Sequence, residues 1–359
     1  MSSMNRVLTT ISHKEPDRVP LFLCLSFYGA KELGMTVPEY FKKPENVVAA
    51  QLAMREKYQN DCLYSFFYAS IELEAFGSET IFVDDGPPNA GAPVLRTIDD
   101  VFRLEPPEID TSPGLTRVLR ATEMLKERVG NEVPIIGIVM SPFSLPVIQI
   151  GFEKYLEMIY FRKDAFERLM EVNDSFCAAW ANAQVAAGAT AIGIFDPLAS
   201  PALVEQPTYL RTGNPVAKRT VAKIKGATAS HLASGRTLPV VREIAETGAA
   251  ILGFGVADDP VALKKEAEGR ICLLGNLNGL EMTHWTKERA HRTVKTVIDQ
   301  FGKGGGFILS DGHGEIPWQV PEEILICLLY TSDAADDLLC VDLGGRRIIN
   351  KKKNKQTPK

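Results

Sequence analysis

Short apolar segments rich in β-branched residues alternate along this chain with amphipathic, helix-like segments. Eight of the apolar segments are expected to be strands. Each is a continuous apolar run, which is typical of parallel strands buried on both faces. Eight alternating units favour a (β/α)8 TIM barrel over an open doubly wound sheet. The expected strands are residues 19–25, 62–66, 134–139, 191–195, 228–232, 250–254, 271–274 and 307–309.

The segments between these strands carry helix signals. Pro44 opens a helix expected to reach about Lys57, Asp164 caps one that continues to about Ala187, and a third spans residues 286–301. A long insert, residues 72–128, separates the second and third strands and should hold an extra strand pair near residues 80–83 and 94–96. The insert either covers the mouth of the barrel or is a plain surface excursion.

The composition of the chain excludes some classes of binding partner. It carries 40 basic and 45 acidic residues, a formal net charge of −5, which argues against nucleic acid or an anionic membrane as the main partner. No apolar run approaches the roughly 18 residues of a membrane span, and the polar N-terminus does not resemble a signal peptide. Cysteines outside the last segment have no paired spacing, so we expect a reducing, cytoplasmic location. They are Cys24, Cys62, Cys177 and Cys272.

The last segment differs in character from the rest. Residues 327–337 (CLLYTSDAADD) and 341–349 (VDLGGRRII), with a lysine-rich end, resemble translated read-through of a transposase-type sequencing adaptor. We therefore expect residues 1–326 to form one barrel with a truncated C-terminus. Residues 327–359 are expected to be an artefact without native fold. The alternative is a disordered basic tail.

Two of the five histidines stand where strands are expected to end. His231 closes one apolar run and His313 follows another. In a barrel, residues just past the strand C-termini line the working face, so the pair predicts a catalytic or metal site. Asp311 and Glu315 lie two residues either side of His313 and could share its side of an extended loop as metal ligands. The alternatives are backbone-bonded histidines, a turn capped by Asp311 and a solvated Glu315.

Other strand-end residues are candidates for the same site. Asp196 ends the fourth strand and is predicted to bind substrate or orient a histidine in a catalytic role, with an Asx-turn as the alternative. Asn276 and Asn278 follow the seventh strand and either bind substrate or shape a turn. Tyr28 and Phe143 could line an apolar pocket for a small methylated substrate. Core packing is the alternative for Phe143.

Several stretches, in this order and spacing, resemble the uroporphyrinogen decarboxylase superfamily and, within it, the branch of cobamide-dependent methyltransferases. Each stretch is short, but together they cover most of residues 4–326. The resemblance implies a (β/α)8 barrel, in agreement with the strand count. The stretches are residues 5–8 (NRVL), 16–20 (PDRVP), 74–77 (EAFG), 141–144 (SPFS), 191–197 (AIGIFDP), 199–201 (ASP), 246–251 (ETGAAI), 274–278 (LGNLN), 307–310 (FILS) and 321–323 (PEE).

The resemblance leaves the reaction open. Uroporphyrinogen decarboxylases carry an arginine-rich loop after the first strand, which grips the many carboxylates of the substrate. The matching residues 23–31 contain no arginine, and Lys31 is their only cation. We therefore expect a methyltransferase that moves a methyl group between a small substrate and a corrinoid on a partner protein. Decarboxylation of a carboxylated tetrapyrrole and a non-catalytic ligand-binding barrel are the alternatives.

The methyltransferase branch is expected to hold zinc through a His-x-Cys pair and a later cysteine. His231 matches the histidine, but Ala233 stands at the first cysteine position and His313 at the second. Imidazole and carboxylate also bind zinc. The resemblance therefore implies a possible zinc site with an altered ligand set, drawn from His231, His313, Asp311 and Glu315.

Overall fold

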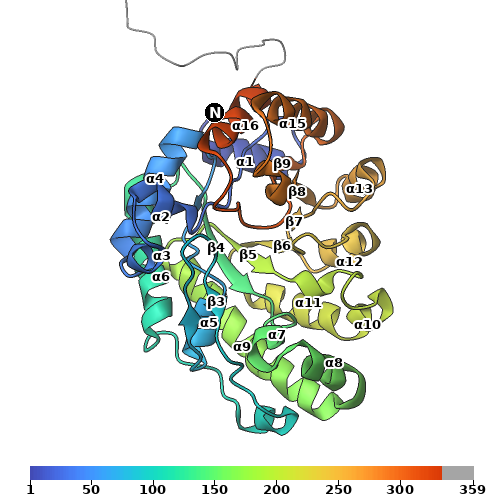
Figure 1. Cartoon of the computed structure of the whole chain (residues 1–359). Helices are drawn as coiled ribbons and strands as arrows, with labels where there is room; N and C mark the ends of the chain where they lie inside the picture. The colour runs from blue at the N-terminus through green and yellow to red at the C-terminus, as the bar shows by residue number, and fades with distance from the viewer. Residues whose placement is uncertain (334–359) are drawn as a thin grey trace, which may run out of the picture.

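The computed structural model describes residues 1–333 and has a TIM-barrel-like α/β fold (Figure 1). Seven parallel strands form one curled sheet in the order β1-β4-β5-β6-β7-β8-β9, with helices packed outside it. The strands are β1 (Leu63–Tyr64), β4 (Ile135–Met140), β5 (Ala191–Phe195), β6 (Ala227–His231), β7 (Ile251–Gly253), β8 (Cys272–Leu277) and β9 (Phe307–Asp311).

Seven of the eight expected strands are confirmed, and the first is not. Residues 19–25 contribute only one isolated parallel bridge, between Leu21 and Leu309 of β9. On the other side of this segment, side chains take the place of a strand partner. The Asn60 amide accepts from the Leu23 N–H (2.9 Å) and donates to the Leu23 carbonyl (3.1 Å). The Gln51 amide likewise joins the Leu25 carbonyl to the N–H of Tyr64 in β1. The backbone groups of the segment are thus satisfied without a regular ladder.

Helices cover the outside of the sheet. The expected helices from Pro44, Asp164 and Thr286 are confirmed as α4, α9 and α15. None of the helices within residues 1–333 combines the length and hydrophobicity needed to cross a bilayer. The α-helices are α1 (Ser3–Ile11), α2 (Tyr28–Leu33), α3 (Val37–Phe41), α4 (Pro44–Tyr58), α5 (Ser70–Ala75), α6 (Pro113–Val129), α7 (Pro146–Ile150), α8 (Phe152–Phe161), α9 (Lys163–Ala187), α10 (Gln206–Arg211), α11 (Gly213–Lys223), α12 (Val241–Ala245), α13 (Pro260–Ala267), α14 (Gly279–Met282), α15 (Lys287–Phe301) and α16 (Glu322–Asp333). The 3₁₀ helices are η1 (Ile98–Arg103), η2 (Pro197–Ala199) and η3 (Leu238–Val240).

The insert between β1 and β4 holds a small antiparallel hairpin. Its strands are β2 (Thr80–Ile81) and β3 (Asn89–Ala90). The expected second strand near residues 94–96 is therefore wrong. Leu95 instead donates its N–H to the carbonyl of Gln149 in α7 (2.9 Å), which ties this end of the insert to the segment after β4.

Side chains of the sheet divide into two apolar layers. One layer, which we call the interior cluster, includes Phe22, Cys24, Tyr64, Leu274 and Ile308, and Val7 of α1 packs into it. Alternate residues on the same strands belong to the larger core that the helices cover. This alternation follows from the two-residue period of a strand, and it decides which side chains reach the inside of the barrel.

The chain stays helical past residue 327. Cys327 and Leu328 of α16 are buried in the larger core. Residues 327–333 therefore belong to α16 in the structure. The origin of this segment stays a prediction, and residues 334–359 lie outside the described part of the chain.

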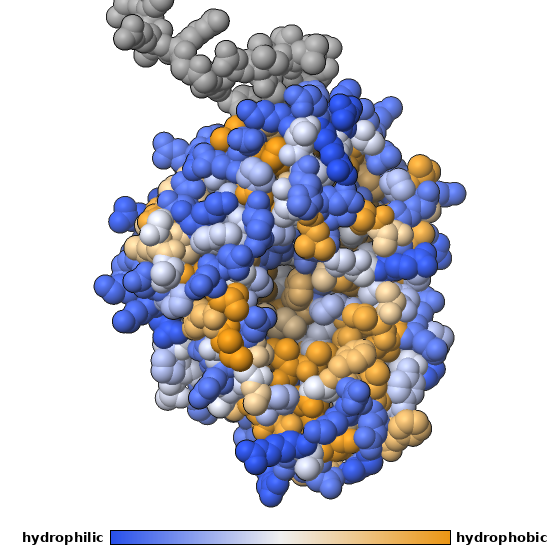
Figure 2. Space-filling view, viewed as in Figure 1, coloured by the Kyte–Doolittle hydropathy of each residue, from blue (hydrophilic) through white to orange (hydrophobic). Residues whose placement is uncertain are grey.

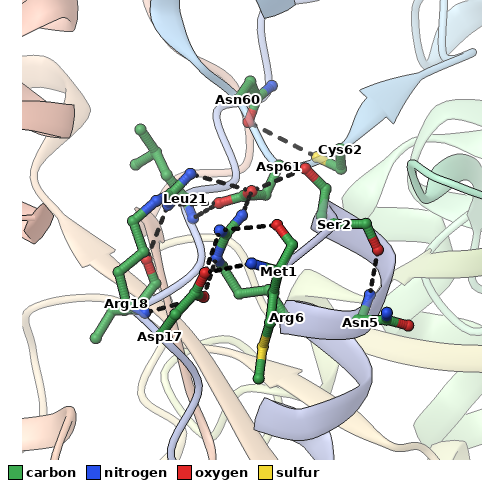
Figure 3. Close-up of polar contacts among 12 residues, drawn as sticks. Met1, Ser2, Asn5, Arg6, Asp17, Arg18, Leu21, Asn60, Asp61 and Cys62 are labelled. Atoms are coloured by element: carbon green, nitrogen blue, oxygen red, sulfur yellow. Dashed lines mark hydrogen bonds and ion pairs between the residues drawn. The ribbon is translucent and has the colours of Figure 1, made fainter.

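A buried ionic cluster ties α1, the first segment and β1 together (Figure 3). Asp61 is 1% exposed and accepts hydrogen bonds from Ser3, Arg6, Arg18 and the Leu21 N–H. Asp17 pairs with Arg6 at the edge of the cluster, and this hydrogen-bonded partner holds the pKa of Asp17 well below its usual range. Removing Asp61 would leave two guanidinium groups partly buried with no carboxylate between them.

We expect Asp61→Ala to lower the free energy of unfolding by about 3–5 kcal/mol, because it breaks a buried ion pair. Urea titration of the purified protein measures the change. Asp299→Ala is the control, because Asp299 forms only an exposed pair with Lys295, and such pairs contribute about 1 kcal/mol or less. Equal losses for the two variants would contradict the assigned role of Asp61.

Candidate functional site

The His231 imidazole is held in a slot at the C-terminal end of β6. Its register partners are Phe195 on β5 and Gly253 on β7. The Phe195 ring stacks on the imidazole, with centroids 5.4 Å apart and an interplanar angle of 18°. A Cβ added to Gly253 would collide with the imidazole ring. Sequence reasoning found His231 but missed these two neighbours, although a glycine at a strand end is a signal of close approach.

The ring nitrogens of His231 have distinct roles. The N–H of Ala233 donates to Nδ1 at 3.0 Å. A backbone amide can only donate, so Nδ1 is the acceptor and the neutral ring carries its proton on Nε2. Ala233 has a φ of 50°, and this left-handed turn carries its N–H back to the ring. Burial, and after it the charge of His313, lowers the pKa of His231 to about 4. His231 is therefore a neutral Nε2–H donor at neutral pH.

The loop after β9 brings His313 to the same place. Asp311 is fully buried and accepts from the N–H groups of His313 (2.8 Å) and Gly314 (2.7 Å). Gly314 has a φ of 98° and passes so close that an added Cβ would lie 3.4 Å from Cε1 of His231. The structure thus places the two histidine-bearing segments side by side, and Asp311 shapes the second of them.

Glu315 lies beside Ser26 and Phe27, which follow the first expected strand (residues 19–25). Its Oε1 accepts from the Ser26 hydroxyl and from the Phe27 N–H. Burial raises the pKa of Glu315 to about 8, against the lowering effect of the hydrogen bonds from Ser26 and Phe27. The carboxyl group is therefore largely protonated at neutral pH. Glu315 is not a freely solvated side chain, because it is half-buried and accepts two hydrogen bonds.

Two of the other expected site residues have structural roles. Asp196 accepts from the Ser144 hydroxyl at 2.6 Å and is buried, which raises the pKa of Asp196. It follows Phe195, whose ring lies against His231, so the strand period turns Asp196 outward to the helix layer. Phe143 is buried among the rings of Tyr155, Phe166 and Tyr209. Neither side chain reaches the imidazoles, which corrects both expectations.

Tyr28 and Asn278 have other structural partners, and a substrate-binding role for Asn276 stays a prediction. The Tyr28 hydroxyl donates to the carbonyl of Val320 in a buried position. Asn278 is the N-cap of α14 and accepts from the Glu281 N–H at 3.2 Å. Asn276 pairs in register with Ser310 near the C-terminal end of β8, and its Oδ1 is buried.

The donor set for zinc does not fit this geometry. Within residues 1–333, no group of three or more His, Cys, Asp or Glu side chains is arranged to hold a metal ion. His231 Nδ1 already accepts from Ala233, and the neutral ring holds a proton on Nε2. Burial raises the pKa of the nearby Cys24 thiol well above its usual range, so Cys24 does not supply a thiolate. The tentative metal set of His231, His313, Asp311 and Glu315 is not assembled.

The structure also contains open space outside the immediate surroundings of His231. A cavity of about 770 Å³ is lined by Glu74, Glu108 and Arg117, beside α5 and the start of α6, away from the imidazoles. Figure 2 shows that the face viewed in Figure 1 is hollowed near its centre, with apolar side chains gathered on its lower side over α7 and α8. The apolar residues exposed on α8 include Phe152 and Phe161.

We expect the stability of Glu315→Gln to match that of the wild type near pH 5 and to exceed it near pH 8.5. The unfolded carboxyl ionises near its ordinary pKa of 4.5, whereas the folded one has a pKa of about 8. The unfolded state therefore binds fewer protons between these values, and Glu315 makes the folded state lose stability as pH rises. Urea titrations at both pH values measure the difference. A constant difference at the two pH values would contradict the assignment.

Comparison with known proteins agrees with this fold. The family described as uroporphyrinogen decarboxylase (URO-D) matches residues 2–333. The uroporphyrinogen decarboxylase of Paraburkholderia xenovorans is 27% identical over 88% of this chain and 91% of its own length. The methylcobamide:CoM methyltransferase MtaA of Methanosarcina barkeri is 26% identical over 89% of this chain and 94% of its own length.

A solved structure carries the same fold. The methyltransferase from Methanosarcina mazei superposes with a TM-score of 0.79 at 20% sequence identity and covers 93% of this chain and 98% of its own. A decarboxylase and a methyltransferase thus match the sequence of this chain at similar identity. With the family match across residues 2–333, these findings show that the chain belongs to the uroporphyrinogen decarboxylase (URO-D) family.

Proposed function

We propose that this protein is a methyltransferase that moves a methyl group between a small substrate and a corrinoid carried by a partner protein. The observation that carries the proposal is the lack of arginine in residues 23–31, the loop in which uroporphyrinogen decarboxylases are expected to carry their substrate-gripping arginines. His231 is neutral, and residues 23–31 hold no arginine. The one cation of that segment, Lys31, donates to the carbonyls of Trp318 and Val320.

This mouth suits an uncharged or weakly charged substrate better than a polyanion. Several carboxylates placed in a partly buried site need fixed cations to balance them. Here the loop that carries His313 also carries two carboxyl groups, the fully buried Asp311 and the half-buried Glu315, and burial raises the pKa of each. A tetrapyrrole with many carboxylates would meet no guanidinium group in the loop that follows the first barrel segment.

The residues of the site can orient a methyl donor and donate hydrogen bonds to it. In methyl transfer from the substrate, the reduced corrinoid of the partner protein would supply the electron pair of the new bond to the methyl carbon, while the bond from this carbon to the donor atom breaks and its electron pair stays on that atom. The Nε2–H of His231 can donate to a group next to this atom, and the protonated Glu315 offers a second donor. The stacked Phe195 ring and the slot at Gly253 hold the imidazole in place, which is the positioning that such a step requires. No step in this scheme passes through zinc.

A decarboxylase and a methyltransferase resemble this chain at nearly the same sequence identity. The choice between these two activities therefore depends on the residues at the mouth of the barrel. The methyltransferase of Methanosarcina barkeri acts with methylcobamide, as its name states. This relative supports a corrinoid partner for the proposed reaction. A decarboxylase remains the competing outcome of the experiment below.

The visible spectrum of a corrinoid tests the proposal. We expect the protein to speed the appearance or loss of methylcobalamin with a methylated substrate, and His231→Ala and His313→Ala to slow it by about 100-fold or more. His284→Ala is the control, because His284 is exposed near α14. Consumption of uroporphyrinogen with release of carbon dioxide, in place of any change in the corrinoid spectrum, would overturn the proposal.

A further inference from the structure

A short hairpin belongs to the insert that follows β1. Its strands β2 and β3 pair Thr80 with Ala90 and Ile81 with Asn89. An isolated two-stranded hairpin is at best marginally stable, even when its strands are longer than these. The place of this hairpin on the molecule therefore depends on the contacts that tie it to other parts of the barrel.

Two contacts beyond its paired residues hold the hairpin in place. The Phe82 ring meets the edge of the Tyr68 ring, with centroids 5.5 Å apart. In the turn of the hairpin, the Gln319 side-chain amide donates to the Asp85 backbone carbonyl (3.1 Å) and to the Asp85 carboxylate (3.3 Å). The contact at Gln319 is exposed to solvent. Single ring contacts and exposed hydrogen bonds are each weak, so the hairpin is held lightly.

These contacts stretch the hairpin across one side of the barrel mouth. It is rooted after β1, whereas Gln319 belongs to the loop after β9, which also carries His313 and Glu315. The segment around Leu21 lies between these two strands, because Leu21 bridges β9 and its carbonyl accepts from the Asp61 N–H just before β1. The hairpin therefore crosses from one neighbour of this segment to the other, at the C-terminal ends of the strands.

The base of the hairpin has room to move. Gly77, with a φ of 98°, follows α5 and precedes the hairpin, and hinges are often placed at small residues at the end of an element. One side of the base, from Ser78 to Thr80, lines the cavity of about 770 Å³ beside α5 and α6. The structure holds the hairpin down, since Pro88 in its turn is buried. A lightly held hairpin beside open space can swing without unpacking the core.

Resting on the proposed function, we propose that residues 78–92 form a mobile cover over the Glu315 side of the mouth, held closed by Phe82 and Gln319. The closed cover shields a small substrate from water. The open cover widens the mouth for the corrinoid on the partner protein, a macrocycle much larger than the substrate. Methyl transfer then requires opening, and a cover that cannot open slows the reaction.

Distances between two spin labels test the movement in the whole protein without any ligand. Labels at Asp84→Cys in the hairpin turn and at Lys265→Cys on α13 report the position of the hairpin, because both residues are exposed. We expect Phe82→Ala and Gln319→Ala each to raise the ratio of open to closed hairpin by about five-fold, the effect of losing one weak contact. Ile81→Ala is the matched control. Ile81 is an exposed side chain of the same hairpin, so its removal should leave the ratio unchanged.

A reversible crosslink tests whether the reaction needs the opening. In a protein with Asp85→Cys and Gln319→Cys, a short bis-methanethiosulfonate reagent joins the two positions, and a thiol reductant removes the link. We expect the linked protein to change the spectrum of methylcobalamin about ten-fold or more slowly than the same protein after reduction and removal of the reductant. The five cysteines within residues 1–333 are buried, and Cys340 is changed to Ser in both experiments.

A single label distance that neither Phe82→Ala nor Gln319→Ala changes would overturn the cover. Equal rates before and after removal of the link would also overturn it, while keeping the proposed function. The failure of the proposed function gives a different pattern. In that case both variants still shift the label distances, but neither linked nor reduced protein changes the corrinoid spectrum. The movement then stands, and its role in admitting a corrinoid falls with the proposed function.

Discussion

The fixed position of the His231 imidazole is the constraint on which the candidate site depends. Three neighbours set it: the Phe195 ring stacked on one side, the missing side chain of Gly253, and the Ala233 N–H bonded to Nδ1. Each comes from a position set by strand register or by the turn after β6. Together they leave one ring nitrogen free, and that nitrogen carries a proton. The ring is thus prepared to donate and is poorly suited to bind a metal ion.

The opposite wall of the barrel is built differently. Where a full strand ladder is missing, the amides of Asn60 and Gln51 bond the backbone of the first segment, and Asp61 fixes its start. Gln51 holds the Leu25 carbonyl, and the next residue, Ser26, donates to Glu315. The hydrogen bonds that secure this segment therefore also position a carboxyl group of the mouth. Stability and site are coupled along this side of the molecule.

Periodicity and turn chemistry predicted much of this arrangement, but not all of it. Continuous apolar runs identified seven strands, and the position of His231 and His313 at strand ends identified the mouth. The first strand was mispredicted because amides distant in sequence replace its ladder, which no local pattern reveals. The prediction of a site role for Asp196 failed because side chains alternate in direction along a strand. The Phe195 side chain points inward, so that of the next residue, Asp196, points outward. The site predictions failed for three more residues, whose side chains pack in the core or cap a helix: Tyr28, Phe143 and Asn278. These contacts form only in the folded chain, so no local sequence pattern predicts them.

The protonation of the imidazoles tests the central claim most directly. A long-range ¹H–¹⁵N spectrum, with His231→Gln used for assignment, reports which nitrogen of each ring carries hydrogen. The account predicts that His231 is a neutral ring protonated on Nε2 at pH 7, and that it gains its second proton only near pH 4. A ring that titrates near its ordinary value of 6.5, or one protonated on Nδ1, would contradict the account.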